Sequence, residues 1–195
     1  MQRIVDRLNE ASKRYEMKIN VKKTKVMIVS KKAGKKLKIV IDGKEVEQVD
    51  KFKYLGAMLT EDGKAMTDIK VRVAMAKEAF SKRRELLVRK MSKRTKKRIV
   101  KCLVWSVALY GCETWALGKV DRDRLEAFEM WCWRKMEKIS YKEKKTNEQV
   151  LGIVREQKEL LESVIRRKKN WIGHVVRGEG LMKDVLEGRC VGKRG

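Results

Sequence analysis

The sequence predicts an α+β protein: one helix and a small antiparallel sheet come first, and a mostly α-helical region follows. β-Branched runs and turn signals are confined to the first 63 residues, whereas after Gly63 apolar residues recur every three or four positions. The chain contains no proline, so its helices can be long. We expect four segments, with the ranges 1–63, 64–118, 119–177 and 178–195.

Residues 1–17 form the first predicted helix, because apolar residues recur there at helical spacing. This apolar face consists of Ile4, Val5, Leu8, Ala11 and Tyr15. Short apolar or β-branched runs at 26–29, 37–41, 45–49 and 52–59 predict three or four antiparallel strands. Asp42-Gly43 is a strong hairpin signal, and the lysine-rich stretch 31–36 is expected to be a solvated loop. Such a small sheet needs a neighbouring surface to lie against.

Two helices are predicted between Gly63 and Gly118. The first begins at a cap formed by Thr67 or Asp68. Its apolar face consists of Ile69, Val73, Ala76, Phe80 and Leu87. The second begins after Ser92, and its apolar side consists of Ile99, Leu103, Val107 and Tyr110.

Further helices are predicted after Asp121. The stripe of the first consists of Leu125, Phe128, Cys132, Met136 and Ile139. Thr146 and Gln149 have the spacing of a capping box, and a last helix extends from about Leu161 to Val175. From Gly178 onward, glycines and charges predict a loose basic tail. Four tryptophans could either stack on unpaired bases or pack in the core, and their helical spacing favours packing. They are Trp115, Trp131, Trp133 and Trp171.

The charge of the chain points to a polyanionic partner. Lys and Arg number 51 against 26 acids, which gives a formal net charge of +25. Such an excess repels itself unless a polyanion is near, so RNA or DNA is the leading partner and an anionic membrane the alternative. No apolar run is long enough to span a membrane, and no signal peptide is recognisable. We expect an intracellular protein, cytoplasmic or nuclear and not secreted, without a membrane partner.

The four cysteines are far apart in the sequence and form no CxxC pair. They are therefore expected to be idle or buried thiols rather than disulfides. With a single histidine, they also lack the spacing of a zinc site, and we expect no metal bound by this chain.

The helix after Ser92 begins with a dense group of cations. Positive charges at the positive end of a helix dipole cost a few tenths of a kcal/mol each, at about 0.3 or more per exposed site. A polyanionic ligand would remove this cost. The group consists of Lys93, Arg94, Lys96, Lys97 and Arg98.

Several motifs in order resemble the reverse transcriptases of non-LTR retrotransposons. They are INVKKTK at 19–25, FKYLGAML at 52–59, LYGCETW at 109–115 and WIGHVVR at 171–177. The resemblance covers nearly the whole chain, up to about Arg177. It implies the last part of a polymerase palm in 1–63 and a basic helical thumb in 64–118, followed by further helices. It also implies RNA and DNA as partners, together with the upstream palm and fingers of the same polymerase.

The resemblance assigns residues in the palm segment. NVKKT at 20–24 matches the family motif in which a lysine approaches the incoming triphosphate, and this places that lysine at Lys23, with Lys22 and Lys25 as adjacent alternatives. A lysine suits the role because its ammonium is a compact charge with a movable proton. The stretch 52–59, with Tyr54, Leu55 and Gly56, is similar to the primer-grip hairpin, where a glycine lets the backbone approach a sugar-phosphate chain. For Tyr54 and Leu55, packing at the junction of palm and thumb is the favoured alternative to primer contact.

The resemblance to a thumb implies that cations hold a template–primer duplex through its phosphates. In the first helix after Gly63 these cations are Lys70, Arg72 and Lys77, and in the second they are the five cations after Ser92.

Catalysis is not expected of this chain alone. The family holds Mg²⁺ on carboxylates that include a Tyr-x-Asp-Asp hairpin just before the segment matching residues 1–17. The early aspartates here form no pair; they are Asp6, Asp42, Asp50, Asp62 and Asp68. Mg²⁺ is therefore expected only for an intact polymerase. A non-catalytic RNA- or DNA-binding module and a helical protein-interaction module remain as alternatives.

Overall fold

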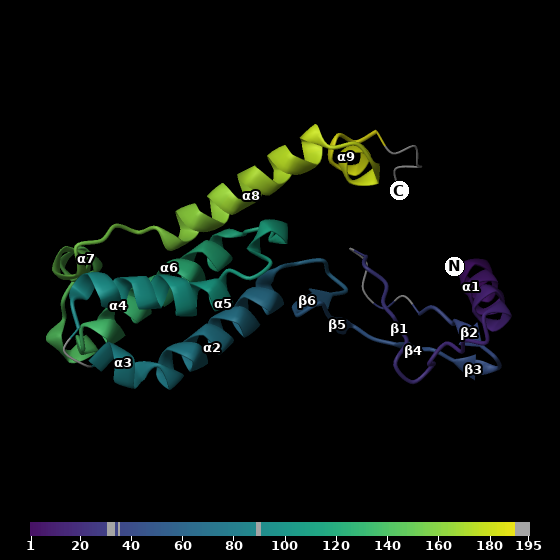
Figure 1. The fold of residues 1–195 in the computed structure, drawn as a ribbon, viewed down its shortest axis with the longest axis horizontal. Helices are drawn as coiled ribbons and strands as arrows, with labels where there is room; N and C mark the ends of the chain where they lie inside the picture. Colours follow the sequence, from purple (N-terminus) through teal and green to yellow (C-terminus); the bar gives the residue numbers. More distant parts are fainter. Residues whose placement is uncertain (31–33, 35, 89–90, 190–195) are drawn as a thin grey trace. The chain divides into compact units, whose positions relative to one another are not determined.

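The computed structural model describes residues 1–30, 34, 36–88 and 91–189 (Figure 1). Its described part is mostly helical, with short strands in small sheets, which agrees with the predicted α+β class. Contacts divide the chain into two compact units, Met1–Asp68 and Ile69–Gly195. Each unit has a hydrophobic core of its own. The predicted loop at 31–36 falls mostly outside the described residues.

The first unit contains one helix and three two-stranded sheets. The helix is α1 (Gln2–Arg14), and the strands are β1 (Lys25–Val26), β2 (Val40–Ile41), β3 (Lys44–Glu45), β4 (Glu47–Gln48), β5 (Lys51–Tyr54) and β6 (Ala57–Thr60). β2–β3 and β5–β6 are antiparallel hairpins, and the predicted turn at Asp42-Gly43 is confirmed. The prediction of a single antiparallel sheet is wrong, because β1 pairs with β4 in parallel. The β2–β3 hairpin reverses the chain before β4 begins, so β4 comes to lie alongside β1 in the same direction.

The core of the first unit is small. Ile39, Ile41 and Val46 are each 3% exposed, and Val5 of α1 packs against them. The other predicted apolar positions of α1 are exposed, among them Ile4, Leu8, Ala11 and Tyr15. The helix is held to β2 by a polar contact instead, in which the Gln2 amide pairs with both backbone groups of Val40 at 2.7 and 3.0 Å.

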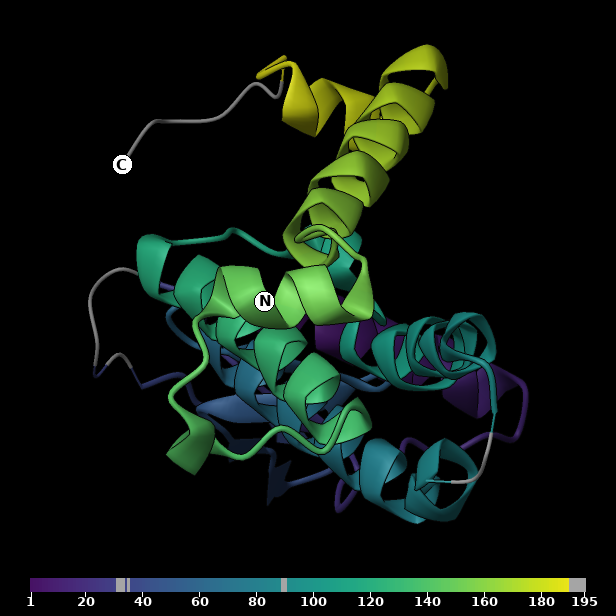
Figure 2. The same cartoon turned by 90° about the vertical axis from the view of Figure 1, so that its left-hand side faces the viewer.

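Helices make up the second unit (Figures 1 and 2). They are α2 (Met66–Lys82), whose first turn belongs to the first unit, α3 (Arg84–Val88), α4 (Lys93–Ile99), the π-helix η1 (Val100–Trp105), α5 (Ser106–Ala108), the 3-10 turn η2 (Cys112–Thr114), α6 (Lys119–Met136), the 3-10 turn η3 (Tyr141–Glu143), α7 (Asn147–Val154), α8 (Leu160–Arg177) and α9 (Leu181–Leu186). Rings of α2 and η1 pack on α6: Phe80 lies 5.1 Å from Trp131, and Trp105 lies 5.5 Å from Trp133, between ring centroids.

The predicted apolar positions of this helix are buried from Ile69 to Phe80, and Leu87 is buried as well. The prediction of one continuous helix is wrong, because α2 ends at Lys82 and Leu87 lies in α3. The predicted cap at Thr67 or Asp68 is wrong, because α2 already begins at Met66. The Asp68 carboxylate accepts the backbone N–H of Met58 at 2.8 Å and thereby ties the start of α2 to β6.

The apolar side predicted after Ser92 is wrong by one position. Ser92 caps α4 as expected, accepting the N–H of Thr95 at 3.2 Å. Leu103 and Tyr110, however, are 38% and 52% exposed. The buried positions are Val100, Val104, Trp105, Ala108 and Leu109. The shift is already present at Val100, the first residue of the π-helix η1, and it continues at four-residue spacing through Val104 and Ala108.

The stripe predicted for α6 is confirmed as buried, and so is the capping box of α7. Trp115 and Trp133 are core residues as predicted, whereas Trp131 and Trp171 are only half-buried. The expectation of an irregular tail is wrong for residues 181–186, which form α9. Residues 190–195 of that tail lie outside the described residues.

Candidate nucleic-acid interface

The cations of α4 and of the start of η1 fall into two groups with different surroundings. Lys93, Lys97 and Lys101 follow one another at four-residue spacing and face the end of α7. Lys93 Nζ donates to Ile153 O at 3.1 Å, and Lys97 Nζ donates to Arg155 O at 3.1 Å. These carbonyls lie at the negative end of the α7 dipole, which favours a cation.

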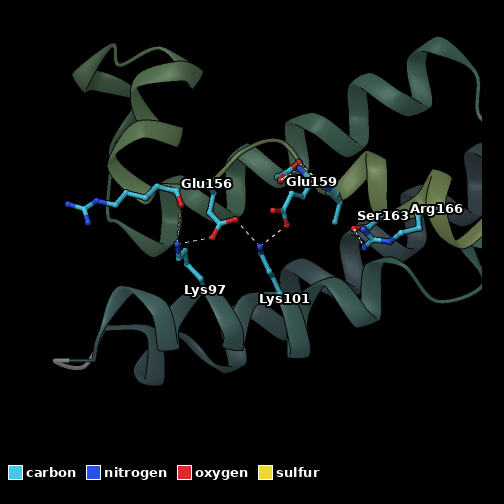
Figure 3. Close-up of polar contacts among 9 residues, drawn as sticks. Lys97, Lys101, Glu156, Glu159, Ser163 and Arg166 are labelled. Carbon is cyan, nitrogen blue, oxygen red and sulfur yellow. Dashed lines mark hydrogen bonds and ion pairs between the residues drawn. The ribbon is translucent and has the colours of Figure 1, made fainter.

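Acidic residues complete this contact (Figure 3). Lys97 Nζ lies 2.8 Å from Glu156 Oε1, and Lys101 Nζ lies 2.8 Å from Glu156 Oε2 and 2.7 Å from Glu159 Oε2. Burial opposes the charges, yet the hydrogen bonds outweigh it, so the pKa of Lys101 is raised and that of Glu156 is lowered. Lys93 and Lys97 were predicted to contact phosphates, and the structure gives both an internal role.

Arg94 and Arg98 form the second group, one helical turn apart and exposed to solvent. Lys96, beside them, is half-buried. Among the residues that the structure describes, none of these three cations has an acidic partner. Of the five cations predicted on α4, these three are the ones free to meet a phosphate.

The cations predicted on α2 also differ from one another. Lys70 and Lys77 are exposed, and Lys77 Nζ lies 5.3 Å from the centroid of the Trp131 ring. Arg72 is only 5% exposed, with its guanidinium 4.3 Å from the centroid of the Tyr110 ring. The solvent-facing position predicted for Arg72 is therefore wrong; its cation–π contact joins α2 to the end of the α5 segment.

Lys23 lies in a tight turn of the first unit. The Lys23 N–H donates to the Asn20 side chain at 3.1 Å, and the Thr24 N–H donates to the Asn20 carbonyl at 2.9 Å. This turn leaves Lys22 and Lys23 exposed, while Lys25 forms an ion pair with Glu47. The structure thus removes Lys25 from the three adjacent candidates.

The segment predicted as a primer grip is the β5–β6 hairpin, and its turn is formed by Leu55 and Gly56. Both have positive φ, +47° and +85°, as a two-residue type I′ turn requires. Gly56 thus supplies the turn geometry. Tyr54 and Leu55 are 57% and 76% exposed, which places their side chains at the tip of the hairpin.

The aspartates of the first unit have local partners. Asp42 accepts from Lys13 at 2.6 Å, and Asp62 accepts from Thr60 at 2.6 Å; these hydrogen bonds lower the pKa of both carboxyls. Within residues 1–30, 34, 36–88 and 91–189, no group of three or more His, Cys, Asp or Glu side chains is placed to hold a metal.

Two thiols lie in the core of the second unit. Burial raises the pKa of Cys112 to about 11, and burial raises the pKa of Cys132 further. Both are protonated at neutral pH and are poor nucleophiles. Cys102 is exposed, and Cys190 lies outside the described residues.

Comparison with known proteins identified no relative of this chain. A scan against protein-family models found no match, and searches of curated proteins and of solved structures found none. In the described part of the chain, no helix has both the length and the apolar character needed to cross a bilayer.

Sequence reasoning missed a pocket in the second unit. It has a volume of about 740 Å³, and its cations are Arg84, Arg134, Lys135 and Lys138. Arg84 comes from the start of α3, and the other three come from the end of α6 and the residues just after it. The pairing of α2–α3 with the end of α6 is a tertiary contact, so only the cluster at 134–138 could have been noticed in the sequence.

Proposed function

We propose that this chain is the template–primer-binding end of a non-LTR retrotransposon reverse transcriptase, a palm segment followed by a thumb, and that it binds RNA and DNA through their phosphates. The observation that carries the proposal is the pair Arg94 and Arg98, exposed on α4 without acidic partners in the described structure. The formal net charge of +25 supports it, because neutralising phosphates releases counterions and favours binding.

Binding without base recognition is what these residues can do. Exposed Lys and Arg on a helix contact phosphate oxygens, which fix position on a duplex but do not specify sequence. Lys70 and Lys77 on α2 extend the same kind of surface. Lys23 and the tip of the β5–β6 hairpin would meet the incoming nucleotide and the primer strand in an intact polymerase.

The test is binding of a fluorescent RNA–DNA hybrid to the full chain over a series of salt concentrations. Arg94→Glu combined with Arg98→Glu should weaken binding equally for hybrids of different sequence, and should lower the slope of log affinity against log salt by about 1 per lost contact. Both side chains are exposed and have no partner in the described structure, so this variant should remain folded. Arg94 also lies in the first turn of α4, where the helix dipole favours an acid.

Lys119→Glu combined with Arg122→Glu is the matched control, because both residues are exposed in the first turn of α6. Equal losses in the two variants would remove α4 from the contact surface, and a wild-type chain that does not bind would contradict the proposed function. With Mg²⁺ and deoxynucleotides added, the bound primer should not be extended by this chain.

The exposed face of α1 supports a neighbouring polymerase segment as partner. Ile4 and Leu8 of α1 are 66% and 58% exposed, and Tyr15 just after the helix is 76% exposed. A mostly apolar pocket of about 460 Å³ is lined by Leu8 together with Val5 and Ile39. Upstream palm residues of the same polymerase would cover such a surface.

A helical interaction module is the second candidate, and α8–α9 favour it. Only Leu160 and Val164 of α8 are buried. Leu181, Met182 and Val185 of α9 are more than half exposed. Figure 1 shows α8 extending past the other helices of its unit, with α9 at its far end. Weak binding of nucleic acid with little salt dependence would favour this alternative.

A further inference from the structure

The cationic pocket of the second unit is built from two helical segments that are distant in sequence. Phe80 and Arg84 contribute one wall, from α2 and α3, and Trp131, Arg134, Lys135 and Lys138 contribute the other, from α6 and its C-terminal end. Its volume of about 740 Å³ is in the range of pockets that hold a nucleotide-sized ligand.

The charge of this pocket is of one sign. Its described lining includes four cations and no Asp or Glu. Arg134 is only 6% exposed, and its Nη2 donates to two neutral groups, Lys145 O at 2.8 Å and Asn147 Oδ1 at 3.2 Å. No carboxylate in the described structure forms an ion pair with it. The guanidinium also lies 5.2 Å from the centroid of the Tyr141 ring, and its charge helps to lower the pKa of Glu143, so the charge of Arg134 is partly balanced. An anion in the pocket would balance the charge of the other three cations.

Helix dipoles explain only part of this arrangement. Arg134 and Lys135 lie in the last turn of α6, where cations are favoured by the negative end of the dipole. Arg84 is the first residue of α3, where a cation is disfavoured for the same reason. Arg84, Lys135 and Lys138 are exposed to solvent, whereas Arg134 is buried, so the pocket combines three accessible cations with one buried cation.

We propose that this pocket binds a phosphate group of the nucleic-acid strand held by the chain. The inference rests on the proposed function and adds a specific subsite to it. The Phe80 and Trp131 rings form an apolar wall that lowers the local dielectric constant and strengthens attraction between phosphate and cations. Trp131 already packs against Phe80, Phe128 and Lys77, so the phosphate, rather than a stacked base, is the group recognised here.

The test compares two double variants of the full chain that each remove two cations. Arg84→Ala with Lys138→Ala changes the pocket and leaves Arg134 in place, because Arg134 also holds the loop before α7. Lys119→Ala with Arg122→Ala is the control, at the opposite end of α6. The probes are a fluorescent RNA–DNA hybrid and inorganic pyrophosphate.

If the pocket binds phosphate, its variant should lose about one to two units of salt slope for the hybrid while the control changes less. Pyrophosphate should compete with the hybrid on the wild-type chain and much less on the pocket variant. If the two variants behave alike toward both probes, the proposal that the pocket binds phosphate is wrong. If the wild-type chain still binds the hybrid strongly in that case, the proposed function remains supported. If wild type does not bind the hybrid, the proposed function fails. Pyrophosphate quenching of tryptophan fluorescence, lost in the pocket variant alone, would then identify a site for free phosphate compounds instead.

Discussion

Glu129 is the most deeply buried acid of the described chain, and it anchors α8. Its side chain is 0% exposed and accepts the backbone N–H groups of Glu159 at 3.0 Å and Leu160 at 3.2 Å. The first N–H groups of α8 have no partner within that helix, so the Glu129 carboxylate on α6 caps the start of α8. Burial raises the pKa of Glu129, and the two backbone hydrogen bonds only partly oppose this effect.

Glu129→Gln should lower the free energy of unfolding by about 1–3 kcal/mol, because the new amide presents an N–H to one of the two backbone donors. This difference should be largest at pH values below the ordinary pKa of 4.5 and should decrease as pH rises above it. The native state binds the Glu129 proton more tightly than the unfolded state. The wild-type stability due to Glu129 is therefore fully present below the unfolded pKa and is lost as pH rises through the folded pKa.

Urea unfolding at several pH values measures both effects. Glu126→Gln, one turn earlier on α6, removes only the partly exposed ion pair with Lys158 and should cost less than about 1 kcal/mol. A difference between wild type and Glu129→Gln that stayed constant with pH would contradict the raised pKa.

Among the elements, the β5–β6 hairpin combines a demanding turn with a predicted contact. Leu55 has φ +47°, a left-handed conformation that a leucine adopts at a cost. Leu55→Asn should stabilise the first unit by up to about 1 kcal/mol, since Asn-Gly is the preferred type I′ sequence. Thermal unfolding would show the gain.

The same position tests whether the hairpin tip touches a primer. Leu55→Ala retains the unfavourable backbone conformation and removes the side chain, so it should not gain stability. If the Leu55 side chain contacts the primer, both variants should weaken hybrid binding while only Leu55→Asn becomes more stable. Unchanged binding in both would exclude that side chain from the interface.

The helix after Ser92 shows how an element can escape sequence reasoning. Its cap and its cationic start were predicted, but the π-helical turn η1 was not, and the buried side moved from Leu103 to Val104. The contacts of the lysines that face α7 could not be predicted from the sequence either. Lys97 and Lys101 look like any exposed cations until the loop with Glu156 and Glu159 folds against them (Figure 3).

At the scale of the whole molecule, the two units should differ in autonomy. Residues 64–195 contain α2 to α9 and most of the buried side chains, whereas the core of the first unit is centred on Ile39, Ile41 and Val46. A chain of residues 64–195 should therefore fold cooperatively, and a chain of residues 1–63 should not.

Circular dichroism with urea titration tests this division, and hybrid binding tests where the proposed contacts lie. Because Arg94, Arg98 and the cationic pocket are all in residues 64–195, that chain should keep the salt slope of the full chain to within about 1. Loss of binding on removal of residues 1–63 would assign the main contact to the first unit.

Local sequence patterns and composition were enough to predict the broad outline of this protein: a short strand-containing segment, a long helical one, and a large excess of positive charge. They also predicted the Asp42-Gly43 turn, the capping of α4 and α7 and the buried stripes of α2 and α6, because these follow from local periodicity and from the hydrogen-bonding preferences of single residues.

Which cations remain available for a ligand depends on contacts between distant parts of the chain. Arg72 contacts the Tyr110 ring. Lys97 and Lys101 pair with acidic residues that lie at least 55 positions later in the sequence, and Arg84 lines the cationic pocket together with residues from the end of α6. Composition gives the number of charges, but the partner of each charge depends on long-range packing of helices. That packing is set by the shape of the whole core rather than by any local pattern.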